Sequence, residues 1–334
     1  MAFLLGRKKF EDLTESISKT VQNLPDEELF KTVEYDPTSA ERGGYSNYSY
    51  WRSTFRMFFK NRTAFALLIV MVLLILFSII QPYLPNQKNP IEIFNDPATG
   101  IQYRNVRPGE LFFFGSNNIG QDLWARIWAG TRTSLFIAFT VAIWGTLIGI
   151  VIGALWGYVR QLDRIITEIY NVIDNIPTTI VMILFAYIMR PGMRTIIIAL
   201  CATGWVGMAL FIRNQIIIIR DREYNLASRC LGVGTFRIIT KNLLPYLVSV
   251  IMMRVALSIP GTISSEVFLT YIGLGLPVSM PSLGNLLNEG RMRMLSASQR
   301  YQLWFPLVVL SMITISFYII GNAFADAADP KNHV

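Results

Sequence analysis

TSLFIAFTVAIWGTLIGIVIGALWGYV, residues 133–159, contains no charged side chain from one end to the other. A helix needs about 20 mostly apolar residues to cross the hydrocarbon core of a bilayer, so this stretch is long enough to span a membrane. Uncharged stretches of similar length occupy residues 63–87 and 301–325. Their presence in one chain predicts a protein that crosses a membrane several times.

The composition argues against several other classes of protein. Of the 334 residues, 52% are hydrophobic and only 16% are charged, whereas a soluble globular domain has about 25% charged residues. Six spans of about 20 residues would leave roughly 200 residues for loops and tails, which argues against a large soluble catalytic domain. The net charge of +8 indicates basic loops on the cytoplasmic side of a membrane, and we expect no nucleic-acid partner.

Residues that carry catalytic or metal chemistry are scarce. His333 is the only histidine, and Cys201 and Cys230 are the only cysteines, so neither zinc binding nor histidine acid–base catalysis is expected. No stretch matches the Gly-x-x-x-x-Gly-Lys-Ser/Thr phosphate-binding loop. We therefore expect no catalytic residue, cofactor or metal in this chain. The first 30 residues also lack the pattern of a signal peptide, so the N-terminus is expected in the cytoplasm.

Largely apolar intervals predict six spans, of which the third and the fifth contain charged residues. The third contains Glu168 and Asp174, yet it has to cross, because otherwise the basic segment 213–241 would lie outside the cell, against the preference of Lys and Arg for cytoplasmic loops. The expected spans are 63–86, 133–159, 165–189, 195–213, 242–266 and 302–325. The expected fold is an all-α polytopic membrane protein with both termini cytoplasmic, a cytoplasmic extension at 1–48 and a cytoplasmic tail at 326–334.

Residues 49–62, just before the first expected span, carry an aromatic and a basic stripe at helical spacing. The stripes consist of Trp51, Phe55, Phe58 and Phe59, and of Arg52, Arg56 and Lys60. This pattern predicts an amphipathic helix in the headgroup region of the membrane. An ordinary juxtamembrane anchor with no further role is the alternative.

Four glycines repeat at every fourth position of the second expected span: Gly145, Gly149, Gly153 and Gly157. This spacing places them on one face of a helix, where the backbone of a neighbouring helix can come close. We interpret them as a helix-packing face. A pore-lining face that widens a path is the functional alternative.

The segment that follows the fourth expected span, residues 213–245, reads RNQIIIIRDREYNLASRCLGVGTFRIITKNLLP. Its middle part is compatible with a short helix that ends at Gly232, and a second helical stretch reaches Pro245. A short helix held between two spans is well placed to be pushed by another protein. Its residues alone favour a docking helix and a solvated loop equally.

Residues 223–245 resemble the EAA loop of ABC-importer permeases, in which a Glu-Ala-Ala sequence, a Gly and a Leu-Pro form the coupling helix that enters a groove of the ATPase subunit. Three other segments resemble the C-type permease of bacterial oligopeptide and dipeptide importers. They are FFFGSNNIGQDLWARIWAGTRTSL (112–135), YIGLGLPVSMPSLGNLLNEGR (271–291) and FYIIGNAFADAADPK (317–331). The chain is identified as a member of this family, and its Asn-Leu-Ala-Ser-Arg-x-Leu-Gly stretch resembles the Ami-type branch of Gram-positive bacteria.

The resemblance implies a type I ABC-importer permease that is coupled to its ATPase through the loop 214–241. Leu226 replaces the EAA glutamate and Ser228 the second alanine, whereas the alanine between them, the glycine and the proline of the pattern are kept. The exchange removes the carboxylate from that position. The expected coupling residues are Glu223, Leu226, Ala227, Ser228, Leu231, Gly232 and Pro245.

The fifth expected span carries Arg254 near its middle, where a cation costs about 2.5–3.5 kcal/mol on insertion scales and has to face protein or water. It either lines the path of the substrate, where it could meet a peptide carboxylate, or is neutralised by Glu168, Asp174 or Glu266. The expected path residues are Arg254, Ser258, Thr262 and Glu266.

These features predict a non-enzymatic permease subunit of an ATP-driven oligopeptide importer in the bacterial cell membrane. The resemblance implies several partners: a second homologous permease, two ATP-binding subunits that hold ATP and Mg²⁺, an extracellular peptide-binding lipoprotein, and the peptide itself. One alternative is an ion-coupled secondary transporter of small polar solutes, for which an internal repeat would be expected. Another is an ABC permease for a non-peptide substrate such as nickel.

Overall fold

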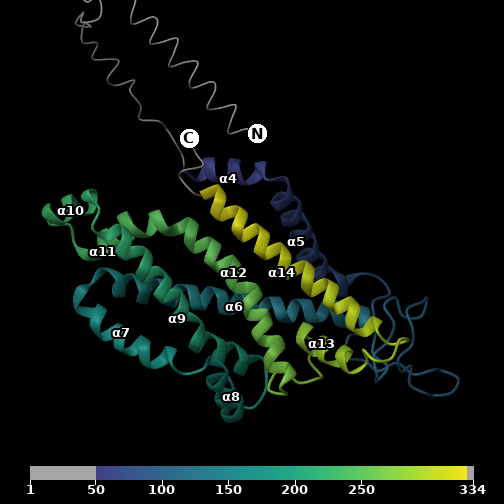
Figure 1. Ribbon diagram of the computed structural model, residues 1–334. Helices are drawn as coiled ribbons and strands as arrows, with labels where there is room; N and C mark the ends of the chain where they lie inside the picture. The colour runs from purple at the N-terminus through teal and green to yellow at the C-terminus, as the bar shows by residue number, and fades with distance from the viewer. Residues whose placement is uncertain (1–49, 329–334) are drawn as a thin grey trace, which may run out of the picture. The chain divides into compact units, whose positions relative to one another are not determined.

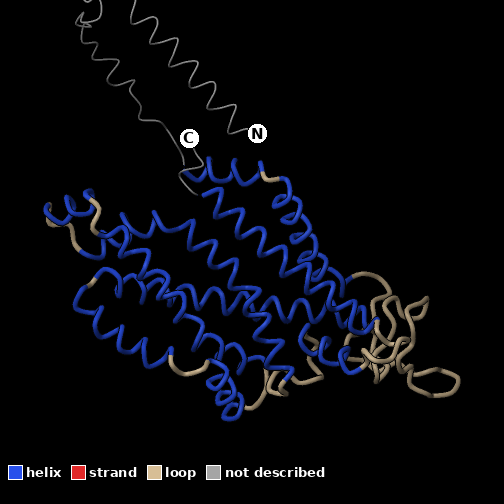
Figure 2. Tube along the Cα trace, in the orientation of Figure 1, coloured by secondary structure: helices blue, strands red, loops and turns tan. Residues whose placement is uncertain are grey.

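The computed structural model describes residues 50–328, in which every regular element is a helix (Figure 1 and Figure 2). The elements are α4 (Tyr50–Lys60), α5 (Arg62–Ile80), η1 (Gln81–Tyr83), α6 (Leu123–Tyr158), α7 (Arg160–Asp174), α8 (Thr178–Met189), α9 (Met193–Arg220), α10 (Glu223–Cys230), α11 (Thr235–Ile238), η2 (Ile239–Leu243), α12 (Leu244–Tyr271), α13 (Leu283–Met292) and α14 (Tyr301–Ala328). The expected extension at 1–48 and residues 329–334 of the expected tail lie outside the described residues.

Five helical segments among the described residues are long and apolar enough to cross a membrane. They are Arg62–Tyr83, Leu123–Tyr158, Met193–Arg220, Thr235–Tyr271 and Tyr301–Ala328. The pair α7 and α8 supplies a sixth when it is counted as one span that bends by 75°. The expected class, an all-α polytopic membrane protein with six spans, is therefore confirmed, with the third span in two pieces.

The bend between α7 and α8 lies at Pro177. Proline has a fixed φ and no N–H, and it disfavours helical backbone at the residue before it. The first helix therefore ends at Asp174, and α8 begins at Thr178, directly after the proline. The sequence-based span at 165–189 assumed one continuous helix that starts later than α7 does.

The long helix α6 begins at Leu123 rather than at residue 133. It therefore includes two arginines that precede the uncharged interval and do not end the helix. Arg126 is fully buried, and its Nη2 lies 2.8 Å from Oε1 of Glu289 in α13. Arg132 donates a hydrogen bond to the backbone carbonyl of Ser78. Arg126 thus has an anionic partner within the protein and Arg132 a carbonyl acceptor, although Nε of Arg126 has no hydrogen-bond partner.

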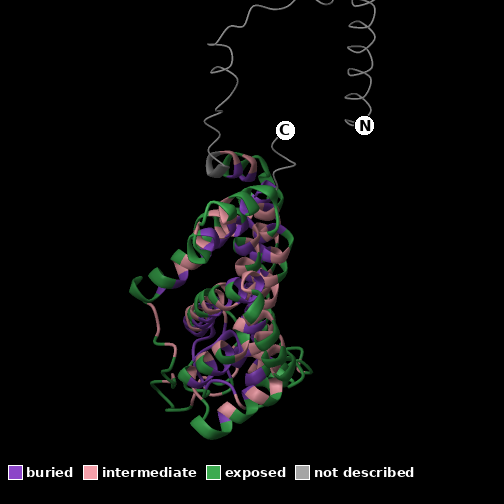
Figure 3. Ribbon diagram, turned by 90° about the vertical axis from the view of Figure 1, so that its left-hand side faces the viewer, coloured by how far each residue is buried: buried purple, intermediate pink, exposed green. Residues whose placement is uncertain are grey.

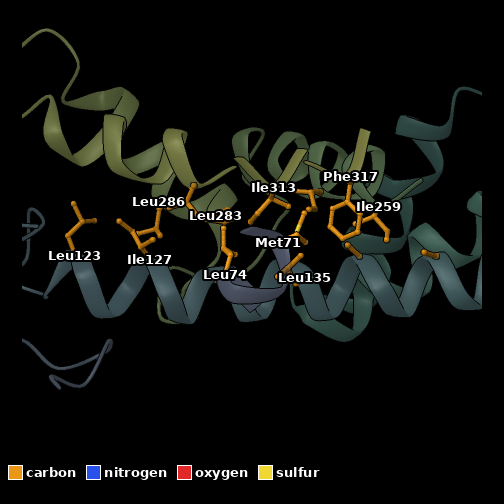
Figure 4. Close-up of a cluster of buried hydrophobic side chains, with 14 residues drawn as sticks. Met71, Leu74, Leu123, Ile127, Leu135, Ile259, Leu283, Leu286, Ile313 and Phe317 are labelled. Atoms are coloured by element: carbon orange, nitrogen blue, oxygen red, sulfur yellow. The ribbon is translucent and has the colours of Figure 1, made fainter. Parts of the chain in front are cut away.

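The largest core cluster lies where α6 passes α5, α12, α13 and α14. In Figure 4, Leu123, Ile127 and Leu135 extend from one face of α6 toward side chains of the other four helices. Their partners are Met71, Leu74, Ile259, Leu283, Leu286, Ile313 and Phe317. Figure 3 shows buried residues where the helices meet and many exposed ones along their outer sides. Exposed apolar side chains are expected on helices that face lipid tails.

The four glycines of α6 face α9. A Cβ atom added at Gly153 would lie 2.4 Å from the carbonyl oxygen of Ala209, and one at Gly149 would lie 2.6 Å from Cβ of Met208. At Gly157 the nearest atom would be the carbonyl oxygen of Arg213 at 2.9 Å, and at Gly145 the distances exceed 3.5 Å. The absence of side chains thus allows the two backbones to touch over three helical turns.

Replacing Gly153 by leucine is expected to separate α6 from α9 and destabilise the protein by more than the ~1–3 kcal/mol typical of an overpacked core. Thermal unfolding in detergent, followed by size-exclusion chromatography, measures the loss. Gly207→Ala in α9 is the matched control, because a Cβ added there meets no atom within 4 Å. Equal stability of the two variants would contradict the packing role of the glycine face.

The connections between helices gather at opposite ends of the bundle. At one end lie α13 and the long connection between η1 and α6 (Figure 1), where the hydroxyl oxygen of Tyr301 is 2.8 Å from the carbonyl oxygens of both Val106 and Ser116. At the other end α10 and α11 join α9 to α12 (Figure 1). A protein in a membrane therefore presents one group of connections to each side.

The helix α4, expected at the membrane surface, packs against the end of α14. Phe58 is buried, and its ring centroid lies 6.1 Å from that of Phe324. Phe55 and Phe59 are about half exposed, and so the aromatic stripe is shared between a protein contact and the surface. The side chains of Trp51 and Arg52 are outside the described set.

Candidate functional site

The helix α10 is a short element that projects from the bundle between α9 and α12 (Figure 1). Gly232 ends it with a φ of +78°, which lies in the left-handed region that favours glycine. The amide of Val233 donates to the carbonyl of Ser228 at 3.1 Å, which is the 6→1 hydrogen bond of a Schellman motif. The chain therefore turns sharply and returns through α11 and η2 to α12.

The inner face of α10 is fixed by Asn225, whose side chain is completely buried. Its Nδ2 donates to the carbonyl oxygen of Ile219, near the end of α9, at 2.9 Å. Its Oδ1 accepts from Nδ2 of Asn242, just before α12, at 3.3 Å. The same Nδ2 of Asn242 lies 3.3 Å from Oγ of Ser228. One asparagine thus joins α10 to the ends of two membrane helices.

Arginines attach this region to α6 as well. Arg220 donates to the carbonyl of Gly157 at 2.8 Å. Arg229 donates to the hydroxyl of Tyr158 at 3.2 Å and to the carbonyl of Arg220 at 3.1 Å. With Asp221 as the anionic partner of both arginines, α10 is held by contacts to α6, α9 and α12. A displacement of α10 would therefore be passed to three helices.

The outer face of α10 and the following turn is apolar and exposed. Leu231 is 84% exposed and Phe236 is 80% exposed, although the connection is otherwise rich in charge. Glu223, Leu226 and Ala227 are also exposed. A cluster of exposed apolar side chains on an anchored element is typical of a protein-binding surface.

The structure brings most of the expected coupling residues together on this element. Ser228 is half-buried and points toward Asn242, whereas Pro245 lies in the first turn of α12, where its missing N–H costs nothing. Sequence analysis missed Asn225, Asn242 and Arg229. The only sequence signal for Asn225 was its place within a short helix, where asparagine is unfavourable unless its side chain finds a hydrogen-bond partner.

A cavity of about 420 Å³, lined by both polar and apolar residues, lies between α6, α8, α9 and α12. Three of the expected path residues line it: Arg254, Ser258 and Thr262. The rest of its lining is made of small, hydroxyl-bearing and apolar residues, among them Gly145 from the glycine face of α6. The lining residues are Val141, Ala142, Gly145, Thr146, Thr178, Met182, Leu200, Thr203, Gly204, Gly207, Met208, Arg254, Leu257, Ser258, Gly261, Thr262 and Ser265.

The fourth expected path residue, Glu266, lies outside the cavity. It is only 1% exposed, and its carboxylate accepts hydrogen bonds from Ser134 at 3.1 Å and Ser282 at 2.8 Å. Thr270 supplies a third at 3.2 Å. The carboxylate thus connects α12 to α6 and to the start of α13. No ion pair joins it to Arg254 within residues 50–328.

A helical membrane bundle with a cavity among its spans and an anchored, exposed helix at one end is typical of a membrane transport subunit that works with other proteins. The chain belongs to the family of binding-protein-dependent transport system inner membrane components, whose family model matches residues 145–334. Residues 49–98 match the N-terminal transmembrane domain of oligopeptide transport permease C. The predicted family and its membrane location are thereby confirmed, and the family consists of transport subunits rather than enzymes.

The relatives agree with the family assignment. The chain is 37% identical to the oligopeptide transport system permease protein AmiD of Streptococcus pneumoniae, over 92% of this chain and 98% of that protein. It is 36% identical to the dipeptide transport system permease protein DppC of Bacillus subtilis, over 85% and 86% of the two chains. A solved structure of the MetNI methionine ABC transporter in an inward-facing conformation has the same fold, with a TM-score of 0.51 at 20% identity over 60% of this chain and 94% of that chain.

Proposed function

We propose that this chain is one of two related membrane subunits of an ATP-driven importer and forms half of the path for oligopeptides. A second permease supplies the other half of the path. Two ATP-binding subunits hold ATP and Mg²⁺ and hydrolyse the nucleotide. An extracellular binding protein delivers the peptide. The chain itself contributes contacts that differ between two conformations and makes or breaks no covalent bond.

The observation that carries this proposal is the exposed apolar surface formed by α10, its C-cap Leu231 and α11, held by a buried asparagine. Exposed apolar side chains such as Leu231 and Phe236 are covered when another protein binds. The anchors at Asn225 and Arg229 transmit the movement of that protein to the membrane helices. The seven expected coupling residues belong to this docking surface or support it.

The orientation of the chain follows from its basic residues. The α10 end contains Arg220, Arg222, Arg229, Arg237 and Lys241, and such residues favour the cytoplasmic side. The helix α4 and the end of α14, and with them both termini, then belong to the cytoplasm. The connection 84–122 and α13 face outward and receive the binding protein.

The substrate class rests on the relatives, which are named as oligopeptide and dipeptide permeases. An ABC permease for a non-peptide substrate such as nickel is the alternative, and measurements of uptake separate the two. An ion-coupled transporter would instead work without ATP, and uptake measurements separate the two.

A site-specific cross-link tests the docking surface. In a background with Cys201→Ser and Cys230→Ser, cysteine at Leu231 is expected to cross-link to an ATP-binding subunit. Cysteine at Leu295, which is 90% exposed after α13 at the other end of the bundle, is the matched control and should not. Cross-linking of the ATP-binding subunit to residue 295 instead of 231 would reverse the proposed orientation.

Replacing Asn225 by alanine is expected to reduce the uptake of peptide per ATP hydrolysed by roughly tenfold. The reason is that losing one partner leaves buried polar groups unsatisfied, at a cost of about 1–3 kcal/mol, and frees α10 from α9 and α12. Parallel measurements of uptake and ATPase activity in proteoliposomes give the ratio. Asn214→Ala, an exposed asparagine of α9, is the control. A normal ratio in Asn225→Ala would rule out the anchoring role.

A further inference from the structure

One face of α12 lines the cavity. The residues on that face follow one another at spacings of three and one: Arg254, Leu257, Ser258, Gly261, Thr262 and Ser265. Arg254 lies ten residues after Leu244, the first residue of α12. At a rise of about 1.5 Å per residue this is about 15 Å, or half of the ~30 Å hydrocarbon core. Arg254 therefore lies near the middle of the candidate span Thr235–Tyr271, away from both of its ends.

No carboxylate in the described part of the chain neutralises this cation. Glu266 is enclosed by its own hydroxyl partners. Glu168 and Asp174 are exposed on α7, outside the cavity lining, and form no ion pair with Arg254 within residues 50–328. The Arg254 side chain is exposed, with its Cζ 5.6 Å from the ring centroid of Phe211. An exposed cation at this depth requires water or an anion.

The hydroxyl groups of the cavity complement the arginine. Four of them donate to carbonyls of their own helices, so their oxygen lone pairs are left to accept N–H groups of a ligand. These bonds are Ser258 to Val255 (2.8 Å), Thr262 to Ser258 (3.0 Å), Ser265 to Gly261 (3.0 Å) and Thr203 to Ala199 (3.2 Å). The cavity thus combines one cationic donor with several neutral acceptors and has no acidic lining residue.

We propose that Arg254 binds the C-terminal carboxylate of the peptide during its passage, while the hydroxyl oxygens accept its last backbone N–H groups. A guanidinium matches the two oxygens of a carboxylate with parallel N–H groups. The C-terminal carboxylate is the anion that linear peptides share whatever their sequence, so a site for it accommodates variable side chains. Glycines leave room for the peptide in the cavity, since a Cβ atom added at Gly207 or Gly261 meets no atom within 4 Å. This inference rests on the proposed function, because it takes the cavity as part of the peptide path.

The test compares two peptides of one sequence, one with a free C-terminal carboxylate and one with a C-terminal amide. ATP-dependent uptake of each is measured with the reconstituted complex. Arg254→Gln is expected to lower the ratio of acid to amide uptake by about tenfold to a hundredfold, the range for losing a hydrogen bond to a charged group. Arg254→Lys, which keeps the charge but not the planar fork, should retain part of the preference.

Loss of the arginine should not hinder assembly, because removing a cation from a span eases insertion. Arg164→Gln, an exposed arginine of α7 outside the cavity, is the control and should keep the wild-type ratio. The same acid-to-amide ratio in wild type and Arg254→Gln would overturn the carboxylate site. A wild-type complex that takes up neither peptide with ATP would overturn the proposed function itself.

Discussion

Leu231→Glu is expected to abolish most ATP-dependent uptake while the chain stays folded and inserted. The side chain is 84% exposed, so it contributes little to the stability of the free subunit. In the assembled importer we expect it to be covered by an ATP-binding subunit, where a buried carboxylate without a partner is costly. Loss of a hot-spot residue of an interface costs ~2 kcal/mol or more, roughly a thirtyfold weakening of binding.

Uptake, and retention of the ATP-binding subunits during purification, are the measurements for this variant. Leu231→Met is the matched control, because it keeps an apolar side chain of similar size and should support normal uptake. A Leu231→Glu complex that assembles and transports as well as the control would show that α10 does not dock on the motor.

Gly261→Leu is expected to block transport without disturbing assembly. A Cβ added at this position meets no atom within 4 Å, and the side chain would extend into the cavity. The substitution is expected to stabilise the helix itself, because leucine is more favourable than glycine in a helix by up to about 1 kcal/mol. The leucine would thus fill the path and leave the fold intact, and Gly261→Ala should be intermediate.

Peptide uptake and the amount of assembled complex are measured together for the Gly261 series. Gly192→Leu is the control, since a Cβ added there also meets no atom within 4 Å, and Gly192 does not line the cavity. Normal uptake by an assembled Gly261→Leu complex would place the peptide path elsewhere.

The existence of the spans was predictable because the hydrocarbon core of a membrane excludes charge. The boundaries of the spans were not predictable, because residues distant in sequence can neutralise a charge. Arg126 stands next to an apolar stretch, and only its contact with Glu289 at 2.8 Å explains why α6 includes it. The break at Pro177, in contrast, was visible in the sequence. Treating 165–189 as one helix overlooked the effect of proline on the preceding residue.

The candidate site likewise depends on contacts between residues that are distant in sequence. Helical geometry turns each residue by about 100°, so Glu266 lies about 120° around α12 from Arg254. Thr262 lies about 80° from Arg254 and lines the cavity, and Glu266 is only about 40° further round, so periodicity alone did not separate Glu266 from the cavity face. The anchor at Asn225 was not predictable, because it depends on Asn242, seventeen positions further along the chain, meeting it at 3.3 Å.

We propose that this chain is one of the two permease subunits of an ATP-driven peptide importer. The most direct test of this proposal is uptake of a labelled oligopeptide into proteoliposomes that contain this chain, its partner permease and the ATP-binding subunits, with the binding protein outside and ATP inside. We expect uptake that requires ATP hydrolysis, is lost when this chain is omitted and persists without an ion gradient. Uptake driven by a proton or sodium gradient in the absence of ATP would contradict the proposed function.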